Sequence, residues 1–369
     1  MCTYKILTIN PGSTSTKIAI YEGTRKLLSE NVSHDAAELA KFPSISDQLP
    51  YREKTIREIL KNSGIPLTEI SAVVGRGGGL MAIEGGVYGI NEILLDHATR
   101  GANGVQHPAQ LGPQLAKKFS DEFNCPAFVV NPPDTDELHP VARMTGIKGV
   151  YRNVHLHALN QKETAIQHAA SMGRKYEDCN FIVCHIGGGI SIAAHLKGRM
   201  VDGNDNVGGD GPMTPTRCGS IPVSEIVDYC FSGVDKQTAK NLCTKSGGFV
   251  SLLGTSDAIE VSARASAGEK VASLAWDTMI YQITKEIGAM AAALHGDVDG
   301  ILLGGGMVHN KELVARITDA CSFIAPVTAY PGEFEMEAMA AGAARALIGA
   351  EQIKTYTGEL CWNKADFED

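Results

Sequence analysis

The chain carries the same strand–turn–strand pattern twice, half a chain apart. The first copy covers residues 5–21 and turns over 11–16, where the residues are small and hydroxyl-rich. The second covers residues 181–195 and turns through three glycines at 187–189. In each copy a short basic turn leads toward a third strand. Two such starts in corresponding positions indicate an internal duplication.

The next elements repeat as well. An amphipathic helix near 52–61 precedes an apolar strand at 72–74 and a glycine-rich loop. In the second half a long helix near 271–295 precedes a strand at 300–303 and another glycine-rich loop. Alternating helices and continuous apolar strands predict an α/β fold, with a sheet in each half covered by helices on both faces.

We place the domain change near residues 149–153, where a loop-like region passes into a helix pattern. An alanine-rich helix near 335–348 could cross back to the first half. The predicted domains are therefore residues 1–150 plus about 335–369, and residues 151–334.

Charge and cysteine usage exclude several classes of protein. The net charge is −9 with no basic block, which argues against a nucleic-acid partner. No signal peptide or long uncharged apolar run is visible, so no membrane association is expected. The nine cysteines form no C-x-x-C pair or zinc spacing and predict a reduced, cytoplasmic protein.

The two turns are candidate phosphate sites of an unusual kind. No G-x-x-x-x-G-K-[ST] or G-x-G-x-x-G motif is present, and each turn joins two strands. Backbone N–H groups and hydroxyls gathered in a turn suit phosphate oxygens. A plain hairpin needs no such long hydroxyl-rich turn, which favours the functional interpretation. The candidates in the first turn are Asn10, Gly12, Ser13, Thr14, Ser15 and Lys17.

Motifs along nearly the whole chain resemble the acetate and butyrate kinase family of the acetate and sugar kinase/actin-like superfamily. The short length and the Gly-Arg-Gly-Gly-Gly run over 75–79 are more similar to the butyrate kinase branch. The motifs are Ile9–Lys17, Leu156–Lys162, Cys184–Gly189, Pro215–Gly219, Leu302–Gly306 and Tyr330–Glu333.

The resemblance implies duplicated ribonuclease-H-like (actin-like ATPase) domains with an interdomain cleft. It implies ATP as donor, ADP as product, Mg²⁺ as cofactor, a small carboxylate as acceptor, and a homodimer or higher homo-oligomer. Arg76, with Gly77, Gly78 and His107, would bind the substrate. Arg217 and His157 would stabilise the transferring phosphoryl group. The nucleotide would meet His185, Gly187, Gly188, Gly189, Gly304, Gly305 and Gly306, and Glu335, rather than Glu333, would help hold the metal.

The chemistry fits these residue types. A carboxylate is already ionised at neutral pH and needs no general base, so arginine and histidine should dominate the site. Glycines after Arg76 suggest space for extra methylenes, and we expect butyrate or isobutyrate as substrate. One departure is Asn131, where the family usually has an aspartate; Asp134 or Asp136 could compensate.

Other functions stay open. An acetate or propionate kinase of the same family is the nearest alternative. A sugar kinase would need an aspartate base, which the loop holding Asp202, Asp205 and Asp210 could supply. An actin-like or chaperone-like ATPase would carry an added module, and a coenzyme A-dependent acyltransferase would lack paired phosphate turns.

Overall fold

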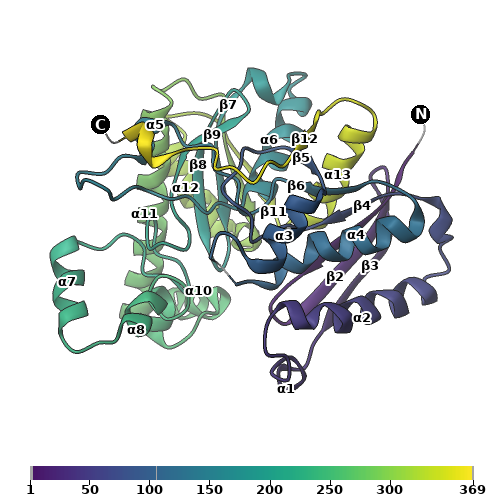
Figure 1. The fold of residues 1–369 in the computed structure, drawn as a ribbon. Helices are drawn as coiled ribbons and strands as arrows, with labels where there is room; N and C mark the ends of the chain where they lie inside the picture. Colours follow the sequence, from purple (N-terminus) through teal and green to yellow (C-terminus); the bar gives the residue numbers. More distant parts are fainter. Residues whose placement is uncertain (1–2, 105, 368–369) are drawn as a thin grey trace. The chain divides into compact units, whose positions relative to one another are not determined.

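The computed structural model describes residues 3–104 and 106–367, so the outermost residues of the predicted domains (1–2 and 368–369) lie outside it (Figure 1). The described chain forms two compact units. The first combines the residues up to Thr135 with Phe334–Phe367, and the second is the continuous segment Asp136–Glu333.

The crossing into the second unit comes earlier than the 149–153 segment favoured by the sequence. Asp136 forms a buried ion pair with Arg143. Glu137 pairs with Lys162 at 2.8 Å and accepts the Met200 N–H at 2.7 Å. These buried contacts connect the start of the segment to the second unit, and no local sequence pattern indicates such distant partners.

The first unit contains a seven-stranded sheet in the order β12-β5-β6-β4-β1-β2-β3. Its strands are β1 (Lys5–Pro11), β2 (Ser15–Glu22), β3 (Arg25–Ser33), β4 (Ile70–Gly75), β5 (Val87–Gly89), β6 (Ala127–Val130) and β12 (Ile353–Thr355). Its helices are α1 (Ala36–Leu39), α2 (Leu49–Asn62), α3 (Glu92–Arg100), α4 (Leu111–Phe123) and α13 (Glu335–Leu347).

The second unit contains a five-stranded sheet in the order β11-β10-β7-β8-β9. Its strands are β7 (Asn180–Ile186), β8 (Ile190–Leu196), β9 (Arg199–Gly203), β10 (Gly300–Gly305) and β11 (Val327–Pro331). Its helices are α5 (Pro140–Arg143), α6 (Ala158–Ser171), α7 (Val223–Phe231), α8 (Lys236–Asn241), α9 (Gly248–Leu253), α10 (Ala258–Ser266), α11 (Lys270–Ala293) and α12 (Lys311–Cys321).

The two sheets confirm the predicted duplication. In the first, β3-β2-β1 form an antiparallel meander, and β4 and β6 continue the sheet in parallel from β1. In the second, β9-β8-β7 form the same meander, and β10 and β11 continue in parallel from β7. The mixed α/β fold predicted from the sequence is therefore correct.

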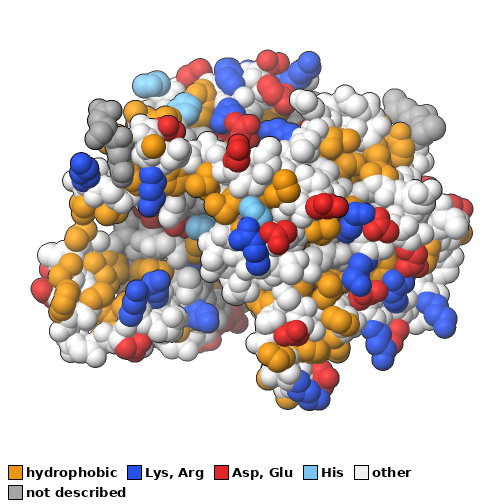
Figure 2. Space-filling view, viewed as in Figure 1, with side chains coloured by type: hydrophobic (Ala, Val, Ile, Leu, Met, Phe, Trp, Pro, Cys, Tyr) orange, Lys and Arg blue, Asp and Glu red, His pale blue; other side chains and the backbone are white. Residues whose placement is uncertain are grey.

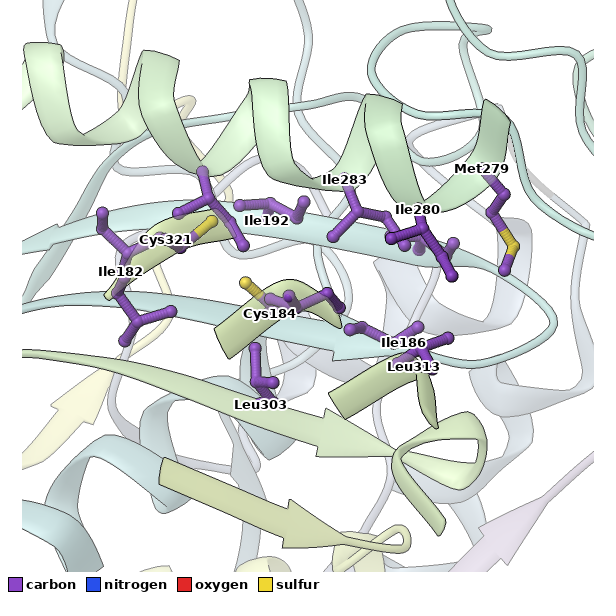
Figure 3. Close-up of a cluster of buried hydrophobic side chains, with 14 of the residues drawn as sticks. Ile182, Cys184, Ile186, Ile192, Met279, Ile280, Ile283, Leu303, Leu313 and Cys321 are labelled. Atoms are coloured by element: carbon purple, nitrogen blue, oxygen red, sulfur yellow. The ribbon is translucent and has the colours of Figure 1, made fainter. Parts of the chain in front are cut away.

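Strand alternation places a core on each face of the second sheet. Ile182, Cys184 and Ile186 of β7 pack with Ile280 and other residues of α11 (Figure 3). The intervening Phe181 and Val183 pack with Ala165 and Ala169 of α6. Continuous apolar strands thus bury both of their faces, as expected for a sheet sandwiched by helices.

The first sheet is covered in the same way. Ile18 and Ile20 of β2 belong to the core that includes residues of α2 and α4. Tyr21 lies on the opposite face of the strand, where burial and the nearby carboxylate of Glu337 on α13 raise its pKa. A Cβ at Gly342 of α13 would lie 2.5 Å from Val130 of β6, so the helix packs closely on the strand. The last helix thus belongs to the first unit.

One part of the second unit contributes surface rather than core. None of the α7 residues is buried, and Val223 and Phe231 are 73% and 88% exposed. Hydrophobic side chains gather over this part of the molecule, at the lower left of Figure 2. Across the described residues, no helix has the length and apolar character needed to cross a membrane.

Candidate functional site

The predicted phosphate turn of the first unit connects β1 and β2. Asn10 and Lys17 are paired across the two strands, so both side chains lie on the same face at the base of the turn. The Gly12 N–H donates to the Ser15 carbonyl at 2.8 Å, which closes the turn. Ser13 and Thr14 are exposed at its tip. The turn therefore offers hydroxyls, an amide and an ammonium group to an anion.

Arg52 of α2 supports this turn from beneath, a role that the sequence analysis missed. Its side chain is fully buried, and its Nη1 donates to the Ser15 carbonyl at 2.9 Å and to Thr16 Oγ1 at 3.0 Å. The remaining donors bind Gln48 Oε1. Within residues 3–104 and 106–367, no carboxylate lies within ion-pair distance of this guanidinium. Burial lowers the pKa of Arg52 to about 10.

Arg76, Asn10 and Glu335 form one cluster in the first unit. Arg76 follows β4 directly, and its backbone N–H donates to the Ile9 carbonyl at 3.0 Å. Its Nη2 lies 3.5 Å from Glu335 Oε1, while Asn10 Nδ2 donates to Glu335 Oε2 at 2.7 Å. Arg76 is only 8% exposed, and its buried Nη1 has no hydrogen-bond partner among the described residues. This cluster therefore retains an unused donor suited to an added anion.

His107 joins the same cluster and also has a structural role. Its Nδ1 accepts the Ala109 N–H at 3.1 Å and caps a short 3-10 helix, η3 (Pro108–Gln110). Burial, followed by the positive charges of Arg76 and Arg52, lowers the pKa of His107. We therefore expect a neutral ring at neutral pH. Since Nδ1 accepts a hydrogen bond, the neutral ring carries its proton on Nε2 and can donate from there.

The glycines after Arg76 do not create the space that the sequence analysis inferred. Gly77, Gly78 and Gly79 all have positive φ, a conformation that suits glycine. A Cβ at Gly77 would lie 2.6 Å from Val129, and one at Gly79 would lie 3.2 Å from Gly101. Protein atoms already occupy the positions of the missing side chains. These glycines allow the backbone to turn and to pack closely, and they do not indicate an enlarged acyl pocket.

Asn131 has a local explanation. Its φ is +38°, a conformation in which asparagine is enriched. Its Oδ1 accepts the Gly86 N–H at 2.7 Å, and its own N–H donates to the Gly86 carbonyl at 2.9 Å. Asp134 and Asp136, which could compensate for the missing aspartate, also have partners. Asp134 accepts a hydrogen bond from Asn103 at 2.6 Å, and Asp136 forms an ion pair with Arg143.

In the second unit, Arg217 packs directly against the triple-glycine turn. A Cβ at Gly189 would lie 1.8 Å from Arg217 Nη1, so any side chain there would displace the guanidinium. Arg217 donates to Asn206 Oδ1, and Thr214 Oγ1 donates to the Gly188 carbonyl at 2.9 Å. Burial lowers the pKa of Arg217, and its buried Nε lacks a partner among the described residues. Gly187 and Gly188 complete the turn.

His157 and His185 lie beside this turn as a stacked pair. Their ring centroids are 3.8 Å apart with an interplanar angle of 13°. His157 Nδ1 is 2.8 Å from Ser191 Oγ, and Gln161 Nε2 donates to the same hydroxyl at 3.0 Å. Ser191 and Gln161 thus orient the histidine. Gln161 stands within a family-like motif, but nothing in the sequence indicated its partner on β8.

A cavity of about 600 Å³ opens beside the triple-glycine turn. It is lined by Gly187, Gly188, Ser256, Asp257, Ala258, Ile259, Ser262, Trp276, Gly306, Met307, His309, Asn310 and Glu333. Of the three glycines predicted to approach adenosine, only Gly306 lines this cavity. Gly305 instead packs on β7, where a Cβ would lie 2.5 Å from the Ile186 carbonyl oxygen. Gly304 lies within β10.

The polar lining residues were missed by the sequence analysis, although a signal exists. Asp257 and Asn310 cap the N-termini of α10 and α12 through their side chains. Asn310 Nδ2 also donates to Ser262 Oγ at 3.0 Å. Each stands just before a helical pattern, as an N-cap residue should. The sequence could indicate the caps but not the cavity that they share.

The protein side chains present could hold magnesium only if bound phosphate supplied further ligands. Among the described residues, no group of three or more His, Cys, Asp or Glu side chains could hold a metal ion. Magnesium, however, is commonly bound by one or two carboxylates together with substrate phosphates and waters. Glu335, held by Asn10 and Arg76, satisfies that requirement in the first unit.

Comparisons with known proteins identify a family and similar folds. The Acetokinase family profile matches residues 127–338. The fold is similar to that of Porphyromonas gingivalis acetate kinase, with a TM-score of 0.76, 19% identity and coverage of 94% of this chain and 100% of that one. It is also similar to a propionate kinase from Francisella tularensis subsp. tularensis SCHU S4, with a TM-score of 0.70, 18% identity and coverage of 92% and 98%. Entamoeba histolytica acetate kinase is similar as well, with a TM-score of 0.74, 16% identity and coverage of 92% of this chain and 98% of that one.

Proposed function

Since this chain belongs to the acetokinase family, we propose that it transfers the γ-phosphoryl group of ATP to a short-chain carboxylate, reversibly, giving an acyl phosphate and ADP. The observation that carries this proposal is Arg76. Its guanidinium is buried, only partly neutralised by Glu335 at 3.5 Å, and keeps an unpartnered Nη1. A substrate carboxylate supplies the missing acceptor and the missing negative charge.

The remaining residues divide the work by chemistry. The carboxylate attacks as an anion, so no residue needs to remove a proton. Arg217 and His157 provide positive charge and a hydrogen-bond donor for the equatorial oxygens of the transferring group. His107, neutral and protonated on Nε2, donates to the substrate or to the phosphoryl group without adding charge. Glu335 would help to hold Mg²⁺, which would neutralise charge on the phosphates when bound.

We further propose that the nucleotide binds in the 600 Å³ cavity of the second unit. In that unit the triple-glycine turn presents donors to the phosphates, and in the first unit the β1–β2 turn offers donors of the same kind to an anion. Gly306 lies at the cavity wall with no protein atom near its missing side chain. Each compact unit then acts as one domain of the enzyme.

For the acid, we propose a four-carbon substrate, butyrate or isobutyrate. The support is the similarity of the motifs to the butyrate kinase branch. Acetate or propionate is equally compatible with the family, and the glycines after Arg76 do not favour either size.

The experiment is a chain-length series. The purified protein is incubated with magnesium ATP, hydroxylamine and each of acetate, propionate, butyrate, isobutyrate and valerate, and acyl hydroxamate is measured. We expect the highest kcat/KM at four carbons. A maximum at acetate or propionate would keep the carboxylate kinase and reject the four-carbon substrate. No hydroxamate with any of the acids would reject the proposed function itself.

A further inference from the structure

Two cysteines lie on segments that meet next to Arg217. Cys218 follows Arg217 directly, and Cys243 comes shortly after α8. The Cys218 N–H donates to the Leu242 carbonyl at 2.9 Å, and the Gly247 N–H donates to the Thr216 carbonyl at 3.1 Å. Backbone hydrogen bonds therefore hold the arginine loop against the segment that carries Cys243.

The two sulfur atoms face each other across a glycine. A Cβ at Gly209 would lie 2.8 Å from Cys243 Sγ and 3.8 Å from Cys218 Sγ. Both sulfur atoms therefore lie next to one common position, and Cys243 is near enough to add to the effect of burial in raising the pKa of the Cys218 thiol. A disulfide would require the two sulfurs to approach to a bonding distance of about 2.05 Å.

Solvent reaches this pair. Both cysteine residues are partly exposed, and both line a cavity of about 510 Å³ beside α7 and α8. Lys236 and Lys240 line the same cavity. Burial raises the pKa of the Cys218 thiol to about 11, so Cys218 suits the role of the second, resolving thiol. Cys230 also lines the cavity and is the natural competitor.

We propose that Cys218 and Cys243 form an oxidation site at which hydrogen peroxide joins them in a disulfide that displaces Arg217. The first sulfur attacks the peroxide, the O–O bond breaks, and a sulfenic acid and one water form. The second thiol attacks that sulfur, the S–O bond breaks, the S–S bond forms, and a second water leaves. Two electrons pass from the sulfurs to the peroxide, and an added dithiol reverses the step.

The consequence for activity rests on the proposed function. Arg217 has little freedom, because its guanidinium fills the space beside Gly189 and binds Asn206. Pulling Cys218 toward Cys243 shifts the adjacent residue. A misplacement of about 1 Å in a catalytic site can lower the rate by about 100-fold.

The test uses the full-length protein with and without hydrogen peroxide. Peptides are mapped by mass spectrometry without reduction, and carboxylate kinase turnover is measured on the same samples. We expect a peptide pair joined through Cys218 and Cys243, a loss of about tenfold or more in turnover, and recovery with dithiothreitol. Cys243→Ser should keep its turnover under peroxide, whereas Cys230→Ser should lose it as the unmodified protein does.

Several results would overturn the inference. These are the absence of the joined pair, a disulfide through Cys230 instead, or equal inactivation of Cys243→Ser. A disulfide that leaves turnover unchanged would reject the displacement of Arg217. If the reduced protein phosphorylates no carboxylate, the proposed function fails, while the peptide map still decides whether the thiol pair reacts. Cys243→Ala, checked by thermal melting, replaces the serine variant if that one does not fold.

Discussion

At the residue scale, Arg52 is a fully buried cation, whereas Arg217 is only partly buried. Arg52 binds only neutral oxygens, those of Ser15, Thr16 and Gln48. Burying a charge without a counterion costs free energy. A polyphosphate beside the β1–β2 turn would offset that cost, so Arg52 both shapes the turn and attracts the anion.

Arg52→Met tests this dual role. The apolar side chain removes a buried charge, so the melting temperature should stay near that of the unmodified protein or rise. The turn loses its support, and KM for ATP should increase about tenfold or more. Arg57→Met, on the exposed face of the same helix, breaks surface ion pairs with Glu53 and Glu122 and should change neither quantity. A normal KM for ATP in Arg52→Met would refute the role.

Arg217→Ala should lower turnover about 1,000-fold or more while leaving ATP binding near normal, because its charge acts on the transition state. Arg217→Lys should recover little, since lysine lacks the planar fork that contacts two oxygens. Steady-state hydroxamate assays and nucleotide titration measure the two effects. A folded Arg217→Ala protein with near-normal turnover would remove the arginine from the mechanism.

The sequence could identify some of these residues but not others. Arg76, His157 and Arg217 stand in contiguous motifs, which a single chain displays directly. Arg52 and Ser191 act through partners that are distant in the sequence, and only the fold brings those partners together. The glycines beside Arg76 were misinterpreted because a missing side chain can mean open space or close packing, and the sequence is the same in both cases.

At the element scale, two adjacent glycines with different surroundings lie where β10 meets the short 3-10 helix η5 (Gly306–His309). Gly305 has a φ of +99° and faces the Ile186 backbone, whereas Gly306 has no protein atom within 4 Å of its missing side chain. Gly305 therefore serves packing, whereas Gly306 leaves open space at the cavity wall.

Gly305→Ala and Gly306→Ala should accordingly differ in kind. Gly305→Ala places a Cβ 2.5 Å from the Ile186 carbonyl oxygen and forces alanine into a conformation that suits glycine. The free energy of unfolding should therefore fall by about 2 kcal/mol or more. Gly306→Ala should melt like the unmodified protein but bind ATP more weakly. Thermal melts and nucleotide titrations of the two variants provide the comparison. Equal melting temperatures would contradict the packing role of Gly305.

Helix α11 carries a pH-sensitive group on its buried side. Burial and the carboxylates of Asp210 and Asp202 raise the pKa of Glu286 to about 7, against the opposing charges of Arg152 and Lys285. The folded protein then holds a proton that the unfolded chain releases near pH 4.5. The stability that Glu286 contributes is present below pH 4.5 and is lost as the pH rises to 7.

Glu286→Gln should remove this pH dependence. At pH 8 the variant should melt about 2–4 °C above the unmodified protein, because no buried carboxylate has to ionise. Melting temperatures from pH 5 to pH 8 give the slope. Asp277→Asn, at an exposed position of the same helix, should retain the slope of the unmodified protein. If Glu286→Gln keeps that slope too, the assignment to Glu286 is wrong.

The elements themselves were largely predictable. Continuous apolar runs and small-residue turns located β1, β2, β7 and β8, and the helix-like segments located α2, α11 and α13 within a few residues. The boundary between the units was not predictable, because it depends on the buried pairs of Asp136 with Arg143 and Glu137 with Lys162. Such pairs carry no local pattern.

At the scale of the whole molecule, the two units differ in continuity. The second is one uninterrupted segment with its own core on each face of its sheet, whereas the first needs both ends of the chain. Helix α13, from the end of the chain, covers the face of the first sheet that includes Tyr21 and Val130.

Fragments should reflect this difference. Residues 136–333 should fold alone and melt cooperatively, because their core is complete. Residues 1–135 alone should not, since one face of their sheet stays uncovered. Joining residues 334–367 to that fragment through a flexible linker should restore a cooperative transition. Circular dichroism melts of the three fragments decide the matter, and a cooperative melt of residues 1–135 alone would contradict the requirement for α13.

The late position of α13 also fixes an order of events during synthesis. The ribosome releases the β1–β6 strands first, but the helix that covers them follows the entire second unit. One face of the first sheet therefore stays without α13 while some two hundred further residues are translated. The second unit, although made later, is the first that can complete itself. Vulnerability to aggregation and to proteases should thus concentrate in the opening third of the chain until translation ends.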